Sequence, residues 1–265
     1  MASINTNAAA MTALQTLTAT NKNLATTQSR ISTGLRVAEA SDNAAYWSIA
    51  TTMRSDNKAF SSVQDSLGLG AGKLDVAYTA VNAAIEVVDQ IKQKMVSAVG
   101  ASEDDKLKIQ TELKELQGQL TSIGLAANYA GSNLIANDQT ETELNIVASY
   151  DRASDGSVTV NKITLDLTAT QILDETGEAG GILDDIMAIE LDGSEDDAAI
   201  EAHLTTIEDA LKLMSDAAAT LGATKSRVDM QMDFVSKLSD AIDRGVGQLA
   251  ARDAFKILSA LALAS

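Results

Sequence analysis

The feature that most constrains the fold is a long stripe of apolar and small residues in the second quarter of the chain. Steps of three and four residues alternate along it without interruption: Phe60, Val63, Leu67, Gly70, Leu74, Ala77, Val81, Ala84, Val88, Ile91 and Met95. This spacing places all the members on one face of an α-helix, as at the seam of a coiled coil. The pattern predicts a single helix over residues 42–99, far longer than an average globular helix.

The composition supports long, closely packed helices. The 265 residues include no proline, which costs about 3 kcal/mol inside a helix. Hydrophobic residues make up 45% of the chain but aromatic residues only 3%, so the core has to be built from small and aliphatic side chains. The absence of cysteine excludes disulfides and thiol nucleophiles. We therefore predict a mainly α protein.

A weaker stripe precedes this helix. It occupies heptad positions from 14 to 35, and two of its seven members are polar: Leu14, Leu17, Asn21, Leu24, Gln28, Ile31 and Leu35. The pattern predicts a helix that requires partners for its order. Gly34 is expected to end it, and Ser41 or Asp42 to cap the helix that follows.

Two more helices are predicted further along. Ser102 with Asp105 forms a capping pattern before the third stripe, which contains Ile109, Leu113, Leu116, Leu120 and Ile123. Ser194 with Asp197 is expected to cap the fourth, whose stripe runs from Ile200 to Ile242. The third helix should fold back antiparallel on the second.

Between these helices the periodicity changes to two. Residues 143–167 alternate apolar and polar side chains, and Asp155-Gly156 supplies a turn, so we predict a β-hairpin. The predicted fold is an elongated, antiparallel, coiled-coil-like helical bundle with a small β-hairpin insert.

Charge argues against two classes of partner. The formal net charge is −17, which opposes binding to nucleic acid or to an anionic membrane surface. No apolar run reaches the roughly 20 residues of a membrane span. The start, MASINTNAAA, lacks the basic and apolar regions of a classical signal peptide. We expect neither nucleic acid nor membrane as a partner.

The motifs that suggest chemistry are incomplete. The stretch from Gly68 to Lys73 resembles a phosphate-binding loop, but Leu74 stands where Ser or Thr is needed. The segment Asp151–Gly156 lacks the third and last ligands of a calcium loop. His203 is the only histidine and has no triad partners in the sequence. We expect no enzymatic activity, no cofactor and no metal.

Three motifs together resemble the N-terminal signature of bacterial flagellin. They are Ile4-Asn5-Thr6-Asn7, the run from Arg30 to Arg36, and the run from Ala40 to Ala45, in matching order and spacing. Leu221-Gly222-Ala223, Arg227 and a helix with Ile242 are similar to the family's C-terminal helix. The resemblance covers roughly residues 3–135 and 195–248, and it points to a short, alphaproteobacterial-like form.

The resemblance implies three structural parts. Residues 1–40 with 249–265 would form a terminal inner-core segment, residues 41–135 with 195–248 a helical rod, and residues 136–194 a small insert in place of larger outer domains. The implied inner-core contacts are Leu14, Leu17, Leu24, Ile31 and Leu35. The implied linker between the two layers contains Ser32, Thr33, Gly34, Ser41, Asp42 and Asn43. Only 17 residues follow residue 248, so the inner-core helix at the C-terminal end is expected to be shortened.

The implied function is mechanical. Flagellin subunits self-assemble into the helical tube of the bacterial flagellar filament, which serves motility. The implied partners are other flagellin subunits, the flagellar export apparatus, an export chaperone and the filament cap, and the implied location is the extracellular flagellum.

Two alternatives remain open at this stage. One is a hook–filament junction protein, which would be present in few copies. The other is a surface binding protein built on the flagellin scaffold, with residues 136–194 as its binding part.

Overall fold

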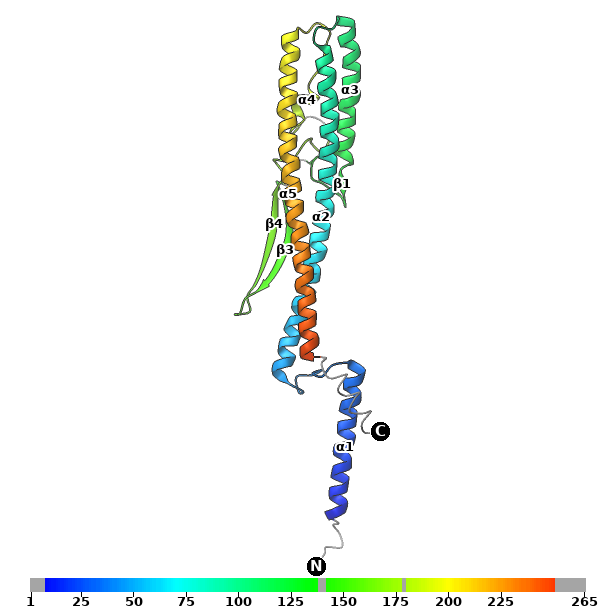
Figure 1. The fold of residues 1–265 in the computed structure, drawn as a ribbon, viewed down its shortest axis with the longest axis vertical. Coiled ribbons are helices and arrows are strands. Elements are labelled where there is room, and N and C mark those ends of the chain that lie inside the picture. Colours follow the sequence, from blue (N-terminus) through cyan, green and yellow to red (C-terminus); the bar gives the residue numbers. More distant parts are fainter. Residues whose placement is uncertain (1–7, 138–141, 178–179, 251–265) are drawn as a thin grey trace, which may run out of the picture. The chain divides into compact units, whose positions relative to one another are not determined.

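The structure, a computed structural model, describes residues 8–137, 142–177 and 180–250. Within these ranges the elements are α1 (Ala8–Thr33), α2 (Ala44–Ala98), α3 (Glu103–Ala126), β1 (Asn128–Tyr129), β2 (Ser132–Asn133), β3 (Glu143–Arg152), β4 (Val158–Asp166), α4 (Asp184–Met187) and α5 (Asp197–Ala250) (Figure 1). The chain divides into two compact units, a terminal unit up to residue 61 and from residue 237 onward, and a central unit of residues 62–236. The predicted class, mainly α with a small hairpin, is confirmed.

In the central unit, α2, α3 and α5 run side by side (Figure 1). Ion pairs define how α2 and α5 are aligned. Lys225 of α5 pairs with Asp75 of α2, and Glu208 of α5 pairs with Lys92 of α2 at 2.5 Å. Because residue numbers rise along one helix as they fall along the other, the two helices are antiparallel.

The long stripe on α2 forms the centre of the core. All its predicted positions, from Phe60 to Met95, are buried. On the neighbouring helix α5, Ile200, Ile207, Met214 and Leu221 are also fully buried. The helix predicted over residues 42–99 is observed at Ala44–Ala98. The α2 prediction is therefore confirmed along its whole length.

The buried face of α3 is not the predicted apolar stripe. Leu113 and Leu120 are fully buried as expected, but Leu116 is only half-buried. Apart from Gly124, the remaining buried positions hold polar side chains, namely Lys106, Gln110 and Gln117. The prediction failed because it treated polar residues as facing solvent, whereas these three side chains bind main-chain atoms.

Their partner is the stretch of chain that leads into α5, residues 183–195, which we call the return segment. The Gln117 side chain donates to the carbonyls of Ile186 and Ile189, at 3.0 Å each. The Gln110 side chain accepts from the amide of Leu191 at 2.8 Å. Lys106 donates to the carbonyl of Glu195 at 2.6 Å. A buried carbonyl needs such a donor because it has no water to bind.

The predicted hairpin is present. Strands β3 and β4 pair antiparallel and are joined by the Asp155-Gly156 turn, where Gly156 has a φ of +89°. The hairpin is held to the bundle on two sides. Gln231 of α5 donates to the carbonyl of Ala148 at 2.9 Å. Gly70 of α2 leaves room for Ile146, since a Cβ there would lie 2.6 Å from the Ile146 side chain.

One predicted helix cap is confirmed and another is wrong. The Ser102 side chain accepts from the amide of Asp105 and caps α3, as expected. Ser194 does not cap α5; its hydroxyl donates to Asp192 across a tight turn at Gly193. The cap of α5 is the Asp196 carboxylate, which accepts from the amide of Ala199 at 2.8 Å.

Among the described residues, no helix combines the length and the apolar character required to cross a lipid bilayer.

Candidate assembly surface and linker

The apolar stripe of α1 faces solvent. Leu14, Leu17, Leu24 and Ile31 are between 50% and 64% exposed, and no residue of α1 is buried. Leu35, in the linker beyond the helix, is half-buried. Four of the five predicted inner-core residues thus form an apolar face without a covering element in the described part of the chain.

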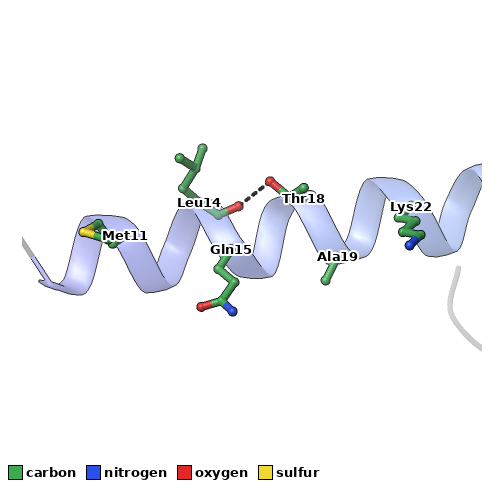
Figure 2. Close-up of a pocket in the computed structure, with 6 residues that line it drawn as sticks. All are labelled: Met11, Leu14, Gln15, Thr18, Ala19 and Lys22. Carbon is green, nitrogen blue, oxygen red and sulfur yellow. Dashed lines mark hydrogen bonds between the residues drawn. The ribbon is translucent and has the colours of Figure 1, made fainter.

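The threonines of α1 turn their hydroxyl groups to the backbone of the helix itself. Seven threonines each donate a hydroxyl hydrogen bond to the carbonyl four residues earlier: Thr12, Thr16, Thr18, Thr20, Thr26, Thr27 and Thr33. The bond from Thr18 to Leu14 is visible beside a shallow hollow lined by Met11, Leu14, Gln15, Thr18, Ala19 and Lys22 (Figure 2). Because these hydroxyl hydrogens already have acceptors, α1 can be covered by another helix at a small cost in unsatisfied donors.

Charge is distributed unevenly along the chain. The first acidic residue is Glu39, and the only charged residues within α1 are Lys22 and Arg30. The net charge of −17 therefore resides in the rest of the molecule. Copies of α1 can approach one another without carboxylate repulsion.

Helix α1 ends where the sequence predicted. Its last residue is Thr33, and Gly34 follows with a φ of +68°. The amide of Gly34 donates to the carbonyl of Arg30 at 2.9 Å. Glycine adopts this left-handed conformation without the steric cost of a side chain.

The predicted start of α2 needs correction. Neither Ser41 nor Asp42 caps it. The cap is Asn43, whose side chain accepts from the amide of Tyr46 at 3.2 Å. Ser41 donates instead to the Glu39 carboxylate at 3.2 Å.

The Asp42 carboxylate binds the linker instead of the helix. One oxygen accepts from the amides of Ala38 and Glu39, at 3.0 and 3.3 Å. The other lies 3.5 Å from the Arg30 guanidinium. The two amide hydrogen bonds, helped by Arg30, hold the pKa of the Asp42 carboxyl below its ordinary value.

Sequence reasoning missed the contacts made by Arg36 in the linker. Its guanidinium donates to the carbonyl of Leu249, near the end of α5, at 3.1 Å and lies over the Tyr46 ring at 5.6 Å. The neighbouring Val37 is only 6% exposed. The available signal was the placement of two arginines, Arg30 and Arg36, around the glycine break of an acidic chain.

A polar cluster joins α2 and α5 in the terminal unit. Asn57 donates to the Asp243 carboxylate at 2.6 Å and accepts from the Ser239 hydroxyl at 2.5 Å. A polar residue inside an apolar seam favours one register over others.

The motifs weighed for chemistry have structural roles. The glycines between Gly68 and Lys73 lie inside α2, so they form no phosphate loop. The Asp151–Gly156 stretch is the end of β3 and the hairpin turn. His203 lies on α5 with its Nε2 3.5 Å from a Glu195 oxygen.

Comparison with known proteins gives a consistent result. The family model of the bacterial flagellin N-terminal helical region matches residues 4–140, and that of the C-terminal helical region matches residues 204–261. A flagellin of Brucella melitensis is 54% identical over 254 residues, covering 96% of this chain and 86% of the relative. Flagellin C of Rhizobium meliloti is 42% identical and covers 96% of this chain and 88% of the relative.

A solved structure shares the fold. A putative flagellar hook-associated protein from Vibrio parahaemolyticus aligns with a TM-score of 0.59 at 19% identity, over 79% of this chain and all of that one. Together, the matching family models, the identity to alphaproteobacterial-like flagellins and the observed helices show that this chain belongs to the bacterial flagellin family, as a structural subunit of the flagellar filament.

Proposed function

We propose that the exposed stripe of α1 is the surface through which subunits polymerise. The observation that carries this proposal is the contrast between two similar stripes. The stripe of α2 is buried within the single chain, whereas Leu14, Leu17, Leu24 and Ile31 of α1 stay exposed. A stripe repeated at heptad spacing and left uncovered is suited to packing against other helices.

The energetics support this role. Full burial of a leucine or isoleucine side chain is worth about 1.5–3 kcal/mol. An isolated helix of 26 residues gains little from local interactions, so most of its stability has to come from packing. Contacts with neighbouring copies would supply that packing, and α1 would become fully ordered only in the polymer.

The proposed arrangement assigns a layer to each part. Residues 1–40 with 249–265 form the inner core, residues 41–135 with 195–248 the outer rod, and residues 136–194 the insert. Ser32, Thr33, Gly34, Ser41, Asp42 and Asn43 belong to the linker between the layers. The break at Gly34 supports this assignment, because a continuous helix could not change direction there. Residues 251–265 lie outside the described residues.

Growth of the polymer is proposed to be heterologous, with one face of a subunit meeting a different face of the next. Such contacts do not close into a ring and produce an open helical tube. Subunits would leave the cell through the flagellar export apparatus with an export chaperone, and assemble under the filament cap outside the cell. Their role is structural rather than catalytic.

A double substitution on α1 tests the polymerisation surface. Leu17→Gln with Leu24→Gln removes two members of the stripe and retains good helix formers. We expect polymerisation, followed by light scattering and electron microscopy, to be lost. Thermal unfolding of the central unit should be unchanged, because neither leucine is buried in the single chain.

The control is Thr26→Gln, two residues from Leu24 and therefore on the opposite side of α1. This variant should polymerise like the parent chain. Normal filaments from the double variant, or equal loss in the control, would contradict the assignment of the stripe.

A further inference from the structure

In the linker between α1 and α2, one side chain contacts both the last turn of α1 and the main chain of the linker itself. We propose that Asp42 acts as a pin that fixes the direction in which α1 leaves the linker, so that every subunit presents its polymerisation surface at the same angle. The functional half of this inference rests on the proposed role of α1.

The first set of contacts closes the linker onto itself. The Asp42 carboxylate accepts from the amides of Ala38 and Glu39, and the Asp42 amide in turn donates to the carbonyl of Glu39 at 3.0 Å. These reciprocal bonds make residues 38–42 a compact turn. An ionised carboxylate is the stronger acceptor for such amides.

The second contact reaches back into α1. The other Asp42 oxygen lies 3.5 Å from Nη2 of Arg30, in the last turn of that helix. The two side chains are 37% and 24% exposed, so water competes with the contact only in part. One carboxylate thus connects the end of α1 with the turn that precedes α2.

The pin acts next to Gly34, where glycine does little to restrict the direction in which α1 leaves the linker. Gly34 is the first residue after α1, and no atom lies within 4 Å of the position where its Cβ would stand. No side chain at residue 34 restricts the direction of α1. Contacts across the linker can supply this restriction, and those of Asp42 are the ones that reach from the linker turn back to α1.

Three substitutions in the full chain separate the two sets of contacts. Asp42→Asn removes the charge: its single amide oxygen is a weaker acceptor for the linker amides, and its NH2 group replaces the oxygen that faces Arg30, so both sets of contacts are weakened. Arg30→Gln removes only the contact to α1. Asp65→Asn is the matched control, since it removes one exposed carboxylate from α2.

The first measurement is hydrogen exchange at neutral pH, read on peptides that contain Ala38 and Glu39. Loss of a charge-assisted hydrogen bond should speed their exchange on the order of tenfold in Asp42→Asn. Arg30→Gln and Asp65→Asn should leave this exchange unchanged.

The second measurement is the spread of distances between α1 and α2. Trp47 is the only tryptophan and the chain has no cysteine, so Trp47 can donate energy to an acceptor on a single introduced cysteine, Thr20→Cys. Time-resolved energy transfer should show a broader distance distribution in both Asp42→Asn and Arg30→Gln, but not in Asp65→Asn. An unchanged distribution and unchanged exchange in Asp42→Asn would overturn the pin.

Electron microscopy of polymerised chains tests the consequence for assembly. Variants with a broadened distribution should give fewer filaments, or filaments of irregular helical shape. Parent-like filaments from them would show that assembly does not depend on the angle that Asp42 fixes, and would overturn the functional half of the inference. Failure of the parent chain itself to polymerise would count against the proposed function, while exchange and energy transfer would still decide whether Asp42 is a pin.

Discussion

At Gly70, the absence of a side chain on α2 allows the hairpin to approach the helix closely. A Cβ at this position would approach three carbons of the Ile146 side chain to between 2.6 and 2.9 Å. Nothing lies within 4 Å of the corresponding position at Gly68, two residues earlier on the same helix. The two glycines therefore have different roles although they share a motif in the sequence.

The substitution Gly70→Ala should destabilise the central unit. The gain of up to about 1 kcal/mol in helix propensity is outweighed by overpacking against Ile146, which typically costs about 1–3 kcal/mol. Gly68→Ala should instead stabilise the protein by roughly 0.5–1 kcal/mol, because it adds propensity without a clash. Urea unfolding monitored by circular dichroism measures both, and a stabilised Gly70→Ala would disprove the tight fit.

Exposed aspartates should make the fold sensitive to acid. The pKa of Asp166 and of Asp192 is lowered first by the hydroxyl of the residue two positions later, Thr168 or Ser194, and then by its amide. A lowered folded-state pKa contributes stability above the unfolded-state value of about 4, and that contribution is lost as the pH falls through the folded-state value.

The free energy of unfolding should accordingly hold steady from pH 7 to about pH 5 and fall below about pH 4. Urea titrations at several pH values give this profile. In the variant Asp166→Asn, the free energy of unfolding should decline less on acidification, because this side chain can no longer take up a proton. A stability that rises with acid would refute the assignment.

Individual caps were the least predictable residues. Short polar side chains near a helix start all have capping chemistry, and the sequence does not reveal which one the backbone brings into position. Asp42 and Ser194 were wrong choices because tight turns engage them in the linker and at Gly193. Asn43 follows Asp42 by one residue and Asp196 follows Ser194 by two, and each has its side chain in position to accept from a free amide of the first helical turn.

At the scale of elements, α3 is a helix with two kinds of buried contact. Leu113 and Leu120 are buried in the bundle core. The side chains of Lys106, Gln110 and Gln117 form hydrogen bonds with the return segment. Buried polar groups are stabilising when every partner is satisfied and costly when one is removed.

The substitution Gln117→Ala should therefore destabilise the central unit by about 1–3 kcal/mol, because it leaves the buried carbonyls of Ile186 and Ile189 without that donor. Gln119→Ala, on the exposed face of the same helix, should change stability by no more than about 0.5 kcal/mol. Equal effects in the two variants, measured by chemical unfolding, would mean that the hydrogen bonds to the return segment are not important.

The elements also show why some patterns were predictable. The stripe of α2 was found in full because purely apolar and small residues at strict spacing leave one face to bury. The buried face of α3 was only partly found, since a periodicity argument counts glutamine and lysine as outside. The hairpin was identified from alternation and a turn dipeptide, while its attachment through Gln231 and Gly70 depends on tertiary contacts that local sequence does not encode.

At the scale of the whole molecule, the sequence predicted which residues form the candidate surface, but not whether that surface is exposed or covered. Leu14, Leu17, Leu24 and Ile31 follow from the heptad pattern. The pattern does not distinguish a stripe covered by the same chain from one left exposed, because both have the same spacing. Only the three-dimensional structure shows that α1 stays uncovered in the described part of the chain.

Charge at this scale should govern assembly. Subunits with a net charge of −17 repel one another, and salt screens that repulsion over a Debye length of about 10 Å at 0.1 M. The critical concentration for polymerisation, measured by sedimentation, should fall as sodium chloride rises from about 0.01 to 0.3 M. Polymerisation that weakens with added salt would instead indicate attraction between opposite charges.

The way α3 holds the return segment has an evolutionary consequence. Lys106, Gln110 and Gln117 bind main-chain carbonyls and an amide, which every amino acid except proline provides in the same form. Exposed side chains of this segment such as Asp184 and Asp185 can therefore be substituted in related sequences without loss of these hydrogen bonds. The exposed side chains of the return segment can therefore vary among related proteins, provided that the three side chains of α3 are kept and residue 191 is not proline.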